Sequence, residues 1–144
     1  MTFKEAEAFA PNGFHDAKID ALHLDYKTGA LSLSMRLLCG SPGMADQEDY
    51  CRAELRVGRL LFCAIDPPDP RYPFAPDHEP LGVSGADGLG DLAANSDLIT
   101  RLPSDASLYR FFVEQWNSFI YIAGHDIRLS LNTGDSLQNA PRTP

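Results

Sequence analysis

The segment LYRFFVEQWNSFIYIA combines large aromatic side chains with a few polar ones. With Asn117-Ser118 as a two-residue turn, it predicts a β-hairpin in which Trp116 lies opposite Phe119. One face of this hairpin then carries the side chains Arg110, Phe112, Glu114, Trp116, Phe119, Tyr121 and His125. Such a mixture is typical of a ligand pocket or of the centre of a protein interface. It is also typical of a central hairpin that is buried on both faces, so two interpretations stay open.

The proline-rich segment DPPDPRYPFAPDHEP is a second candidate for recognition. Proline restricts the backbone, so this segment presents Arg71 and Tyr72 at little entropic cost. Packing of Tyr72 and Phe74 over a sheet edge is the alternative, because prolines also protect edges. We expect one composite binding patch, with Tyr72 and Trp116 as anchors and Arg71 or Glu114 setting its polarity.

Catalytic and metal-binding motifs are not found in the sequence. It has no Walker loop, GxSxG or HExxH motif, and its glycine cluster GVSGADGLG does not follow an apolar strand. Two His-Asp pairs, His15-Asp16 and His125-Asp126, could orient a base or hold a metal. Adjacent strand residues point to opposite faces, however, so neither pair chelates an ion by itself. We expect no metal, no cofactor and a non-enzymatic function.

The cysteines Cys39, Cys51 and Cys63 are twelve residues apart, which is far from a CxxC spacing. An odd number of cysteines favours a reducing compartment, where each would be a small buried hydrophobic residue. The start of the chain carries Glu5 and Glu7 where an export signal needs an apolar stretch. These features predict a cytoplasmic location.

The charge balance restricts the class of partner. The chain has 12 Lys and Arg residues against 20 Asp and Glu residues, a net charge of −8. Such a balance is a poor footprint for nucleic acid or anionic lipid. No run approaches the roughly 18 apolar residues of a membrane helix. We expect a protein partner with a basic surface, no nucleic acid and no membrane, and the oligomeric state stays open.

Alternating apolar residues in 17–38 predict a hairpin with a turn at Thr28-Gly29. In this register Leu24 lies opposite Leu33. A β-bulge near Asp20-Ala21 would turn the side chains of the preceding strand toward the core, namely Ile19, Ala17 and His15.

Residues 50–65 alternate in the same way and predict another hairpin, with Gly58-Arg59 as a type II′ turn. This register places Cys51 and Cys63 on opposite faces and excludes a disulfide between them.

Three hairpins predict a mainly β fold, an antiparallel sandwich or bent sheet of hairpins with at most one or two short helices. We expect a single domain over 1–144, with flexible ends at 1–11 and 132–144. Residues 81–107 are read either as a short helix or as a loop followed by a strand over Leu98–Leu102.

Three stretches of the chain, GFHDA, DPPDPRYPF and FFVEQWNSFIYIA, resemble a family of small bacterial proteins with no assigned activity. The closing strand IYIAGHDIRLSL is similar to that of members described as immunity proteins of toxin systems. The resemblance spans most of residues 12–131. It implies a bacterial, cytoplasmic, β-rich domain that binds a partner, and its motifs name no chemistry.

The sequence therefore predicts a non-enzymatic protein-binding module, bacterial, cytoplasmic and immunity-like. The alternative is a small-molecule-binding protein or an enzyme, with a pocket around Arg110, Glu114, Trp116, Tyr121 and His125. A closed pocket over Trp116 would favour the alternative, whereas an exposed aromatic patch would favour the binding module.

Overall fold

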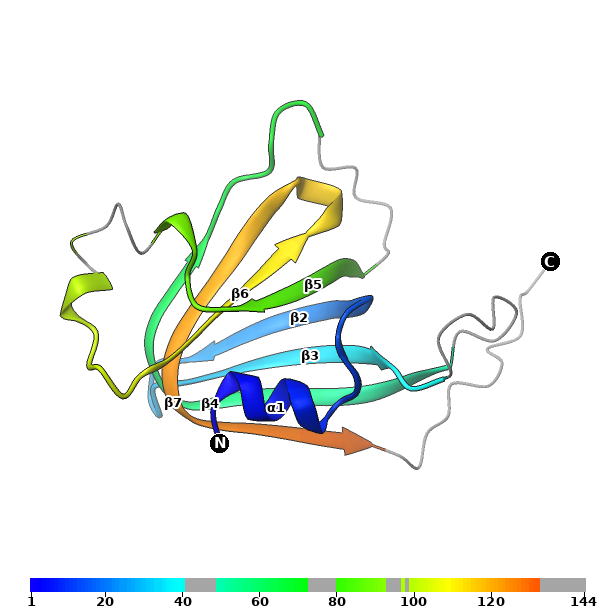
Figure 1. Ribbon diagram of the computed structural model, residues 1–144, viewed down its shortest axis with the longest axis horizontal. Coiled ribbons are helices and arrows are strands. Elements are labelled where there is room, and N and C mark those ends of the chain that lie inside the picture. Colours follow the sequence, from blue (N-terminus) through cyan, green and yellow to red (C-terminus); the bar gives the residue numbers. More distant parts are fainter. Residues whose placement is uncertain (41–48, 73–79, 93–96, 98, 133–144) are drawn as a thin grey trace.

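The chain begins with a short helix and continues mainly as strands in a computed structural model, which describes residues 1–40, 49–72, 80–92, 97 and 99–132 (Figure 1). The elements are α1 (Phe3–Phe9), β1 (Pro11–Phe14), β2 (Ala17–Asp25), β3 (Ala30–Leu38), β4 (Tyr50–Ile65), β5 (Leu81–Asp87), the 3-10 turn η1 (Ile99–Arg101), β6 (Ser107–Val113), the 3-10 turn η2 (Glu114–Trp116) and β7 (Ser118–Asn132). Within the described residues, no helix is long and apolar enough to cross a membrane.

Six of the described strands close into an antiparallel barrel in the order β2-β3-β4-β7-β6-β5. The prediction of a mainly β, antiparallel fold is confirmed. The bend expected for the sheet continues until its two edge strands, β2 and β5, pair with each other. This closing contact pairs Ala17–Ile19 with Leu81–Val83 and shortens the open edge of both strands, which are common sites of unwanted strand pairing.

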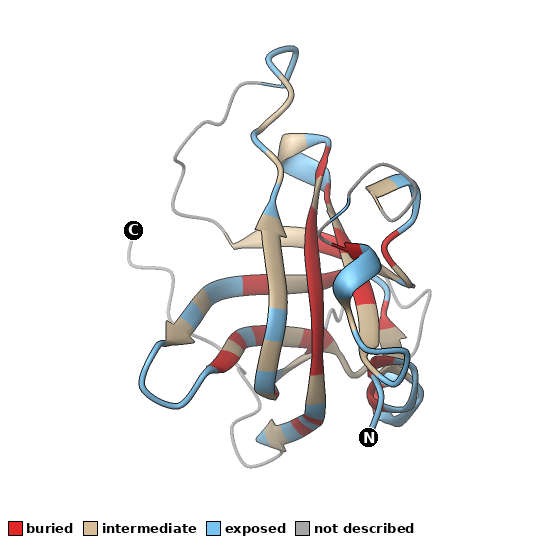
Figure 2. Cartoon of the chain, turned by 90° about the vertical axis from the view of Figure 1, so that its left-hand side faces the viewer, coloured by how far each residue is buried: buried red, intermediate tan, exposed pale blue. Residues whose placement is uncertain are grey.

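The barrel interior is filled by the alternating apolar residues of its strands. On β3, Leu31, Leu33, Met35 and Leu37 are buried while the residues between them are not. Figure 2 shows how buried, intermediate and exposed positions are distributed over the chain. The rings of Phe14, Tyr109 and Phe111 pack beside these aliphatic side chains, with centroids 4.9–5.7 Å apart. A two-residue period with one buried face is what holds each strand in its register.

The N-terminal residues, expected to be a flexible end, instead form α1 against the barrel. Thr2 and Glu5 make a capping box at the start of the helix. Phe3 is fully buried, and its ring stacks on Tyr109 at a centroid distance of 5.2 Å. The terminal amine donates to the carbonyl of Ile127. This residue lies beyond Gly124, where the pairing of β7 with β6 ends. The helix thus covers the side of the barrel where these two strands separate.

Residues 81–107 contain an element that the sequence reading missed, the barrel strand β5. Of the two alternatives considered for the segment after β5, Asp91 and Leu92 are helical, and the described part of the strand considered over Leu98–Leu102 contains the single turn η1 instead. Of the predicted flexible end 132–144, all but the first residue lies outside the described residues.

The turn predicted at Gly58-Arg59 is wrong, because β4 runs through these residues as one strand. A continuous strand and a tight hairpin show the same alternation, and here β7 pairs with β4 on both sides of Gly58. Gly58 allows a close approach of β7, since a Cβ atom at this position would lie 3.0 Å from the Cβ of Asp126. Beyond it, a bulge between Leu60 and Phe62 shifts the register.

The first hairpin forms with a register two residues away from the predicted one. Leu24 pairs with Leu31 rather than with Leu33, because a four-residue turn replaces the expected two-residue turn. Asp25 organises this turn by accepting the backbone N–H of Lys27 at 2.8 Å. The bulge is confirmed between Ile19 and Ala21.

The side chains before this bulge divide differently from the prediction. Ala17 and Ile19 are buried as expected, whereas the side chain of His15 is exposed. The backbone of Asp16 has a φ of 55°, which reverses the chain and turns Phe14 inward in place of His15.

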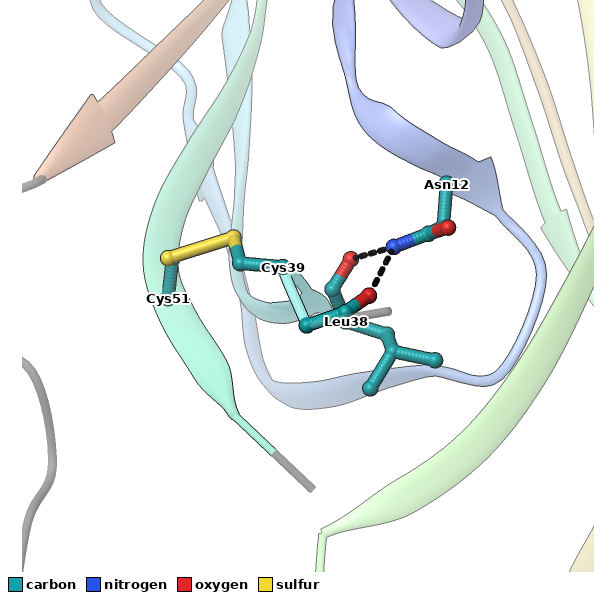
Figure 3. The surroundings of a disulfide bond; sticks show 5 residues. Asn12, Leu38, Cys39 and Cys51 are labelled. Carbon is teal, nitrogen blue, oxygen red and sulfur yellow. Dashed lines mark hydrogen bonds between the residues drawn. A yellow bond between two sulfur atoms is a disulfide. The ribbon is translucent and has the colours of Figure 1, made fainter. Parts of the chain in front are cut away.

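The cysteines also differ from the expectation of isolated buried residues. Cys39 and Cys51 form a disulfide, with their Cα atoms 5.9 Å apart (Figure 3). Cys63 is free and half-buried, and burial raises the pKa of its thiol. Beside the disulfide, the side-chain amide of Asn12 donates to the carbonyl of Leu38 at 2.7 Å and to the carbonyl of Gly40 at 3.0 Å. The β3–β4 register is the cause of the pairing, because it aligns the end of β3 with the start of β4.

Candidate functional site

The β6–β7 hairpin forms with a longer turn than predicted. Phe112 pairs with Phe119, whereas a two-residue turn would have paired it with Ala123. Residues 114–117 make the turn instead. Because the register differs by an even number of residues, the aromatic side chains on the two strands still share one face.

This aromatic face is largely a second small core outside the barrel. Leu89 and Ile99, from the segment between β5 and β6, are buried together with Tyr121. Phe119 is among the partly buried side chains packed against them. The packing of Phe119 and Tyr121 in this second core favours the interpretation of the hairpin as one that is covered on both faces.

A small cavity of about 140 Å³ remains beside this second core. Its polar lining comes from Asp91, Arg110 and Tyr121. The Arg110 guanidinium lies 5.9 Å from the ring centroid of Phe119, and the Tyr121 hydroxyl donates to Asp66 at 3.2 Å. Burial, together with the Asp66 carboxylate, raises the pKa of Tyr121. Leu89 and Phe119 also belong to the lining, so the cavity is a small open notch of mixed polarity rather than an enclosed ligand site.

The five residues named for the alternative pocket do not together line any of the cavities of about 140, 240 and 290 Å³ among the described residues. Arg110 and Tyr121 line the small cavity just described, but Glu114 lines another, of about 240 Å³, with Lys18 and Tyr50. The side chain of His125 is only 13% exposed and lies 3.9 Å from Asp105. The fifth residue, Trp116, packs against the main core. Glu114 and Trp116 are separated from the other residues because they lie in the four-residue turn and do not pair between β6 and β7.

Asp69 attaches the proline-rich segment to the β6–β7 turn. Its backbone N–H donates to the carbonyl of Trp116 at 2.8 Å, and its carboxylate accepts the Asn117 amide at 3.1 Å. Arg71 donates to the same carboxylate from its backbone, from Nε and from Nη2. The hydrogen bonds from Arg71, foremost, hold the pKa of Asp69 well below its usual range. Two segments far apart in sequence are thereby held side by side.

The surface around Asp69 carries three of the residues that the composite-patch prediction named, namely Arg71, Tyr72 and Trp116, whereas Glu114 lines the cavity with Lys18 and Tyr50. We call Ile65, Arg71, Tyr72 and Trp116 the tip patch. Tyr72 is 50% exposed and Ile65 is 51% exposed, while Trp116 is half-buried beneath the turn. The side chain of Arg71 is 81% exposed even though it is paired with Asp69. An exposed apolar surface with one cationic group is thus presented on an ordered segment.

The sequence predicted no role in the binding site for Asp69 or Asn117. Asn117 was identified as a turn residue, and its φ of 46° agrees with the left-handed conformation that asparagine tolerates. That its side chain would reach Asp69 depends on where the chain goes after β4. Only the sequence DPR hinted at a local Asp69–Arg71 pair.

Among the described residues, no group of three or more His, Cys, Asp or Glu side chains is arranged to hold a metal ion. Comparisons with protein-family models, curated proteins and solved structures found no match to the chain.

Proposed function

We propose that this protein is a non-enzymatic protein-binding module that docks its partner on the tip patch. The observation that carries the proposal is the attachment of the proline-rich segment to the β6–β7 turn through Asp69. This attachment keeps Tyr72 exposed on an ordered backbone. Large aromatic side chains presented in this way are the residues that most often dominate binding energy at protein interfaces. Their ordering before binding reduces the entropy cost of association.

The cavities support a protein partner better than a small molecule. The described residues line cavities of about 140, 240 and 290 Å³. These volumes lie at or below the lower end of the range of about 300–1,000 Å³ that is typical of sites for drug-sized ligands. Two of the exposed large apolar side chains, Ile65 and Tyr72, lie instead on the outer surface, at the end of β4 and in the proline-rich segment that follows it. Exposed apolar surface of this kind is typical of a site that associates with another protein.

The partner that we infer has a basic rim around an apolar centre. The net charge of −8 favours a basic partner, and Asp66 and Glu114 place carboxylates on the two segments that form the tip patch. Two of the motifs that resemble the bacterial immunity-like family, DPPDPRYPF and FFVEQWNSFIYIA, supply these segments. A bacterial source and an immunity-like role, in which the patch would bind a toxin, are part of this proposal.

The Cys39–Cys51 disulfide indicates the kind of cellular compartment in which the protein is located. Disulfides persist in oxidising compartments and are rare where thiols are kept reduced. The disulfide therefore favours an oxidising compartment over the cytoplasm predicted from the odd cysteine count. Labelling protein from its source cells with a thiol reagent, without reductant, should modify only Cys63 if this is correct. Modification of all three cysteines would restore the cytoplasmic location.

Affinity purification from source cells with Tyr72→Ala as bait tests the proposed function. Loss of a central aromatic residue typically costs about 2 kcal/mol or more, about thirtyfold in affinity. Tyr26→Ala is the matched control, because Tyr26 is 89% exposed on the turn between β2 and β3, away from the tip patch. The partner recovered with the unmodified protein should be lost with the first variant and retained with the second.

Thermal unfolding separates binding from folding. We expect Tyr72→Ala to leave the unfolding temperature nearly unchanged, because the side chain is half exposed. Equal recovery of the partner by both variants would overturn the tip patch as the docking site. A variant that unfolds the barrel while its folded fraction keeps full affinity would make the proline-rich segment an edge cover only.

A further inference from the structure

The outer surface of β2, β3, β4 and β7 is formed by three cross-strand rows of residues. The first row contains His23, Ser32, Arg56 and Arg128. The second contains Ala21, Ser34, Glu54 and Ser130. The third contains Lys18, Arg36, Arg52 and Asn132. Between the charged residues the side chains are mostly small. Lys18 lies over the ring of Tyr50 at 4.4 Å and Arg36 is paired with Asp20, whereas no ion pair is formed by Arg52, Arg56 or Arg128 with a described residue.

We call this surface the arginine face. It carries the cations Lys18, Arg36, Arg52, Arg56 and Arg128 and the carboxylates of Asp20 and Glu54, and the carboxylates of Asp25 and Asp126 lie just beyond the first row. The whole chain has a net charge of −8, so this face has the opposite sign to the rest of the molecule. Charge of one sign gathered on one side of a protein steers a partner of the other sign toward that side.

The pairing across the strands makes this arrangement costly for the fold. Arg56 lies directly opposite Arg128, and Arg36 lies directly opposite Arg52. Like charges in directly opposed positions destabilise an antiparallel pair. Arg36 is compensated by Asp20, whose carboxylate accepts its Nη2 at 2.6 Å and its Nε at 3.1 Å.

No such compensation exists for the other arginines within the described part of the chain. No carboxylate of a described residue lies within ion-pair distance of Arg52, Arg56 or Arg128. All three side chains are exposed. Their guanidinium groups are available to an external acceptor, and an acceptor would also relieve their mutual repulsion.

We propose that the arginine face docks an extended acidic segment of a partner protein. Each arginine offers a planar fork that binds a carboxylate through two hydrogen bonds. Arg52 and Arg56 are four residues apart on β4, a separation of about 13 Å at the usual strand rise. An extended peptide places residues i and i+4 at the same separation. Two acidic residues at this spacing can therefore meet both arginines together.

Glu54 distinguishes a protein segment from a nucleic acid. It lies between Arg52 and Arg56 on the same outer face of β4. A uniform polyanion would meet a like charge at this point, whereas a peptide can place a neutral residue there. The three rows contain no Phe, Tyr or Trp on which bases could stack, and one side of the Tyr50 ring beside them is covered by the Lys18 ammonium group at 4.4 Å. A long polyanion would, in addition, be repelled by the acidic remainder of the molecule.

A labelled decapeptide of Glu, Ser and Gly, with Glu at i and i+4 and Ser at i+2, is the probe. Its binding is followed by fluorescence anisotropy at low salt, beside a scrambled peptide of the same composition. We expect the ordered peptide to bind more tightly, and its affinity to fall as salt is added. Single-stranded DNA and vesicles containing phosphatidylserine are tested in the same way.

The variant pair Arg56→Gln/Arg128→Gln should weaken binding of the ordered peptide about tenfold, or about 1.4 kcal/mol. Lys27→Gln/Arg101→Gln is the matched control, since it makes the same change in net charge away from the arginine face. The control should change the affinity less than about twofold. Circular dichroism verifies that both variants fold.

Equal losses in both variant pairs would overturn the proposal, because net charge alone would then explain the binding. Tighter binding of DNA or of the vesicles than of the peptide would overturn it in favour of that partner. No measurable peptide binding would also overturn it. Tyr72→Ala should bind the peptide normally, so failure of the tip patch and failure of the arginine face give different results.

Discussion

Asn117 donates a hydrogen bond from Nδ2 to the Asp69 carboxylate, 3.1 Å away, across 48 residues of sequence. The φ of Asn117 is 46°, a left-handed conformation that closes the turn before β7. The contact connects the last turn of the barrel to the proline-rich segment after β4. The exposed position of Tyr72 depends on it, because Tyr72 follows Asp69 in a turn in which its N–H donates to the Asp69 carbonyl.

Asn117→Gly should loosen the proline-rich segment without changing the turn. Glycine adopts the left-handed conformation freely but lacks the amide that reaches Asp69. We expect limited trypsin digestion to cut after Arg71 several-fold faster, because the segment opens locally. Cleavage after Arg101 should keep its rate and serves as the internal control. An unchanged rate at Arg71 would show that the hydrogen bond does not hold the segment.

The same contact predicts a response to acid. The pKa of Asp69 is lower in the folded protein than in the unfolded chain, chiefly because of the hydrogen bonds from Arg71. Its ionised form therefore contributes stability that is fully present above the unfolded pKa of about 3.9 and is lost as the pH falls from there through the folded pKa. Trp116 is the only tryptophan, and its carbonyl accepts the Asp69 N–H. Its emission should change below about pH 4, and Asp69→Asn should lack this change.

Gly85→Ala should destabilise the barrel. A Cβ atom at Gly85 would overlap the hydroxyl of Tyr109 and lie 2.6 Å from its Cε1 and Cζ atoms. Tyr109 is fully buried, so it has little room to move, and overpacking of this kind costs about 1–3 kcal/mol in the free energy of unfolding. Urea denaturation measures the loss. Tyr109→Phe in the same chain should recover only part of it, because the ring atoms remain in contact; additive losses would contradict this coupling.

Arg128→Glu should stabilise the folded protein even though it weakens the arginine face. The substitution replaces a like-charge pair with Arg56 by an opposite-charge pair, a gain of about 0.2–1 kcal/mol in the free energy of unfolding. Thermal denaturation at low salt should show a higher midpoint. Adding Arg56→Glu restores a like-charge pair and should cancel the gain. A lower midpoint for the single variant would show that the two arginines do not repel each other.

Loss of the Cys39–Cys51 disulfide should lower the stability of the barrel. The bond joins residues 12 positions apart, and removal of a short loop closure of this kind costs about 2–4 kcal/mol. Cys39→Ser/Cys51→Ser should therefore unfold at lower urea concentration than the unmodified protein. A reducing agent should shift the unmodified protein in the same direction and leave the double variant unchanged. Equal sensitivity of both proteins to the reducing agent would contradict the pairing.

The sequence by itself determined the elements that depend on local pattern. Two-residue alternation placed most of the strands, and the break between Ile19 and Leu22 located the bulge in β2. Even the wrong registers kept the correct faces, because both hairpins differ from prediction by an even number of residues. The segments that form the tip patch were also identified, since aromatic and proline-rich composition is visible without a fold.

Only the tertiary structure decided how these elements are joined. Gly58 is read locally as a turn, yet the pairing of β7 with both halves of β4 keeps the strand continuous. The Cys39–Cys51 bond follows from the β3–β4 register, and the helix at the N-terminus is held by burial of Phe3 against Tyr109. Each of these outcomes depends on contacts between residues distant in sequence. Local propensity contributes little energy to such contacts, and burial, hydrogen bonding and register decide them.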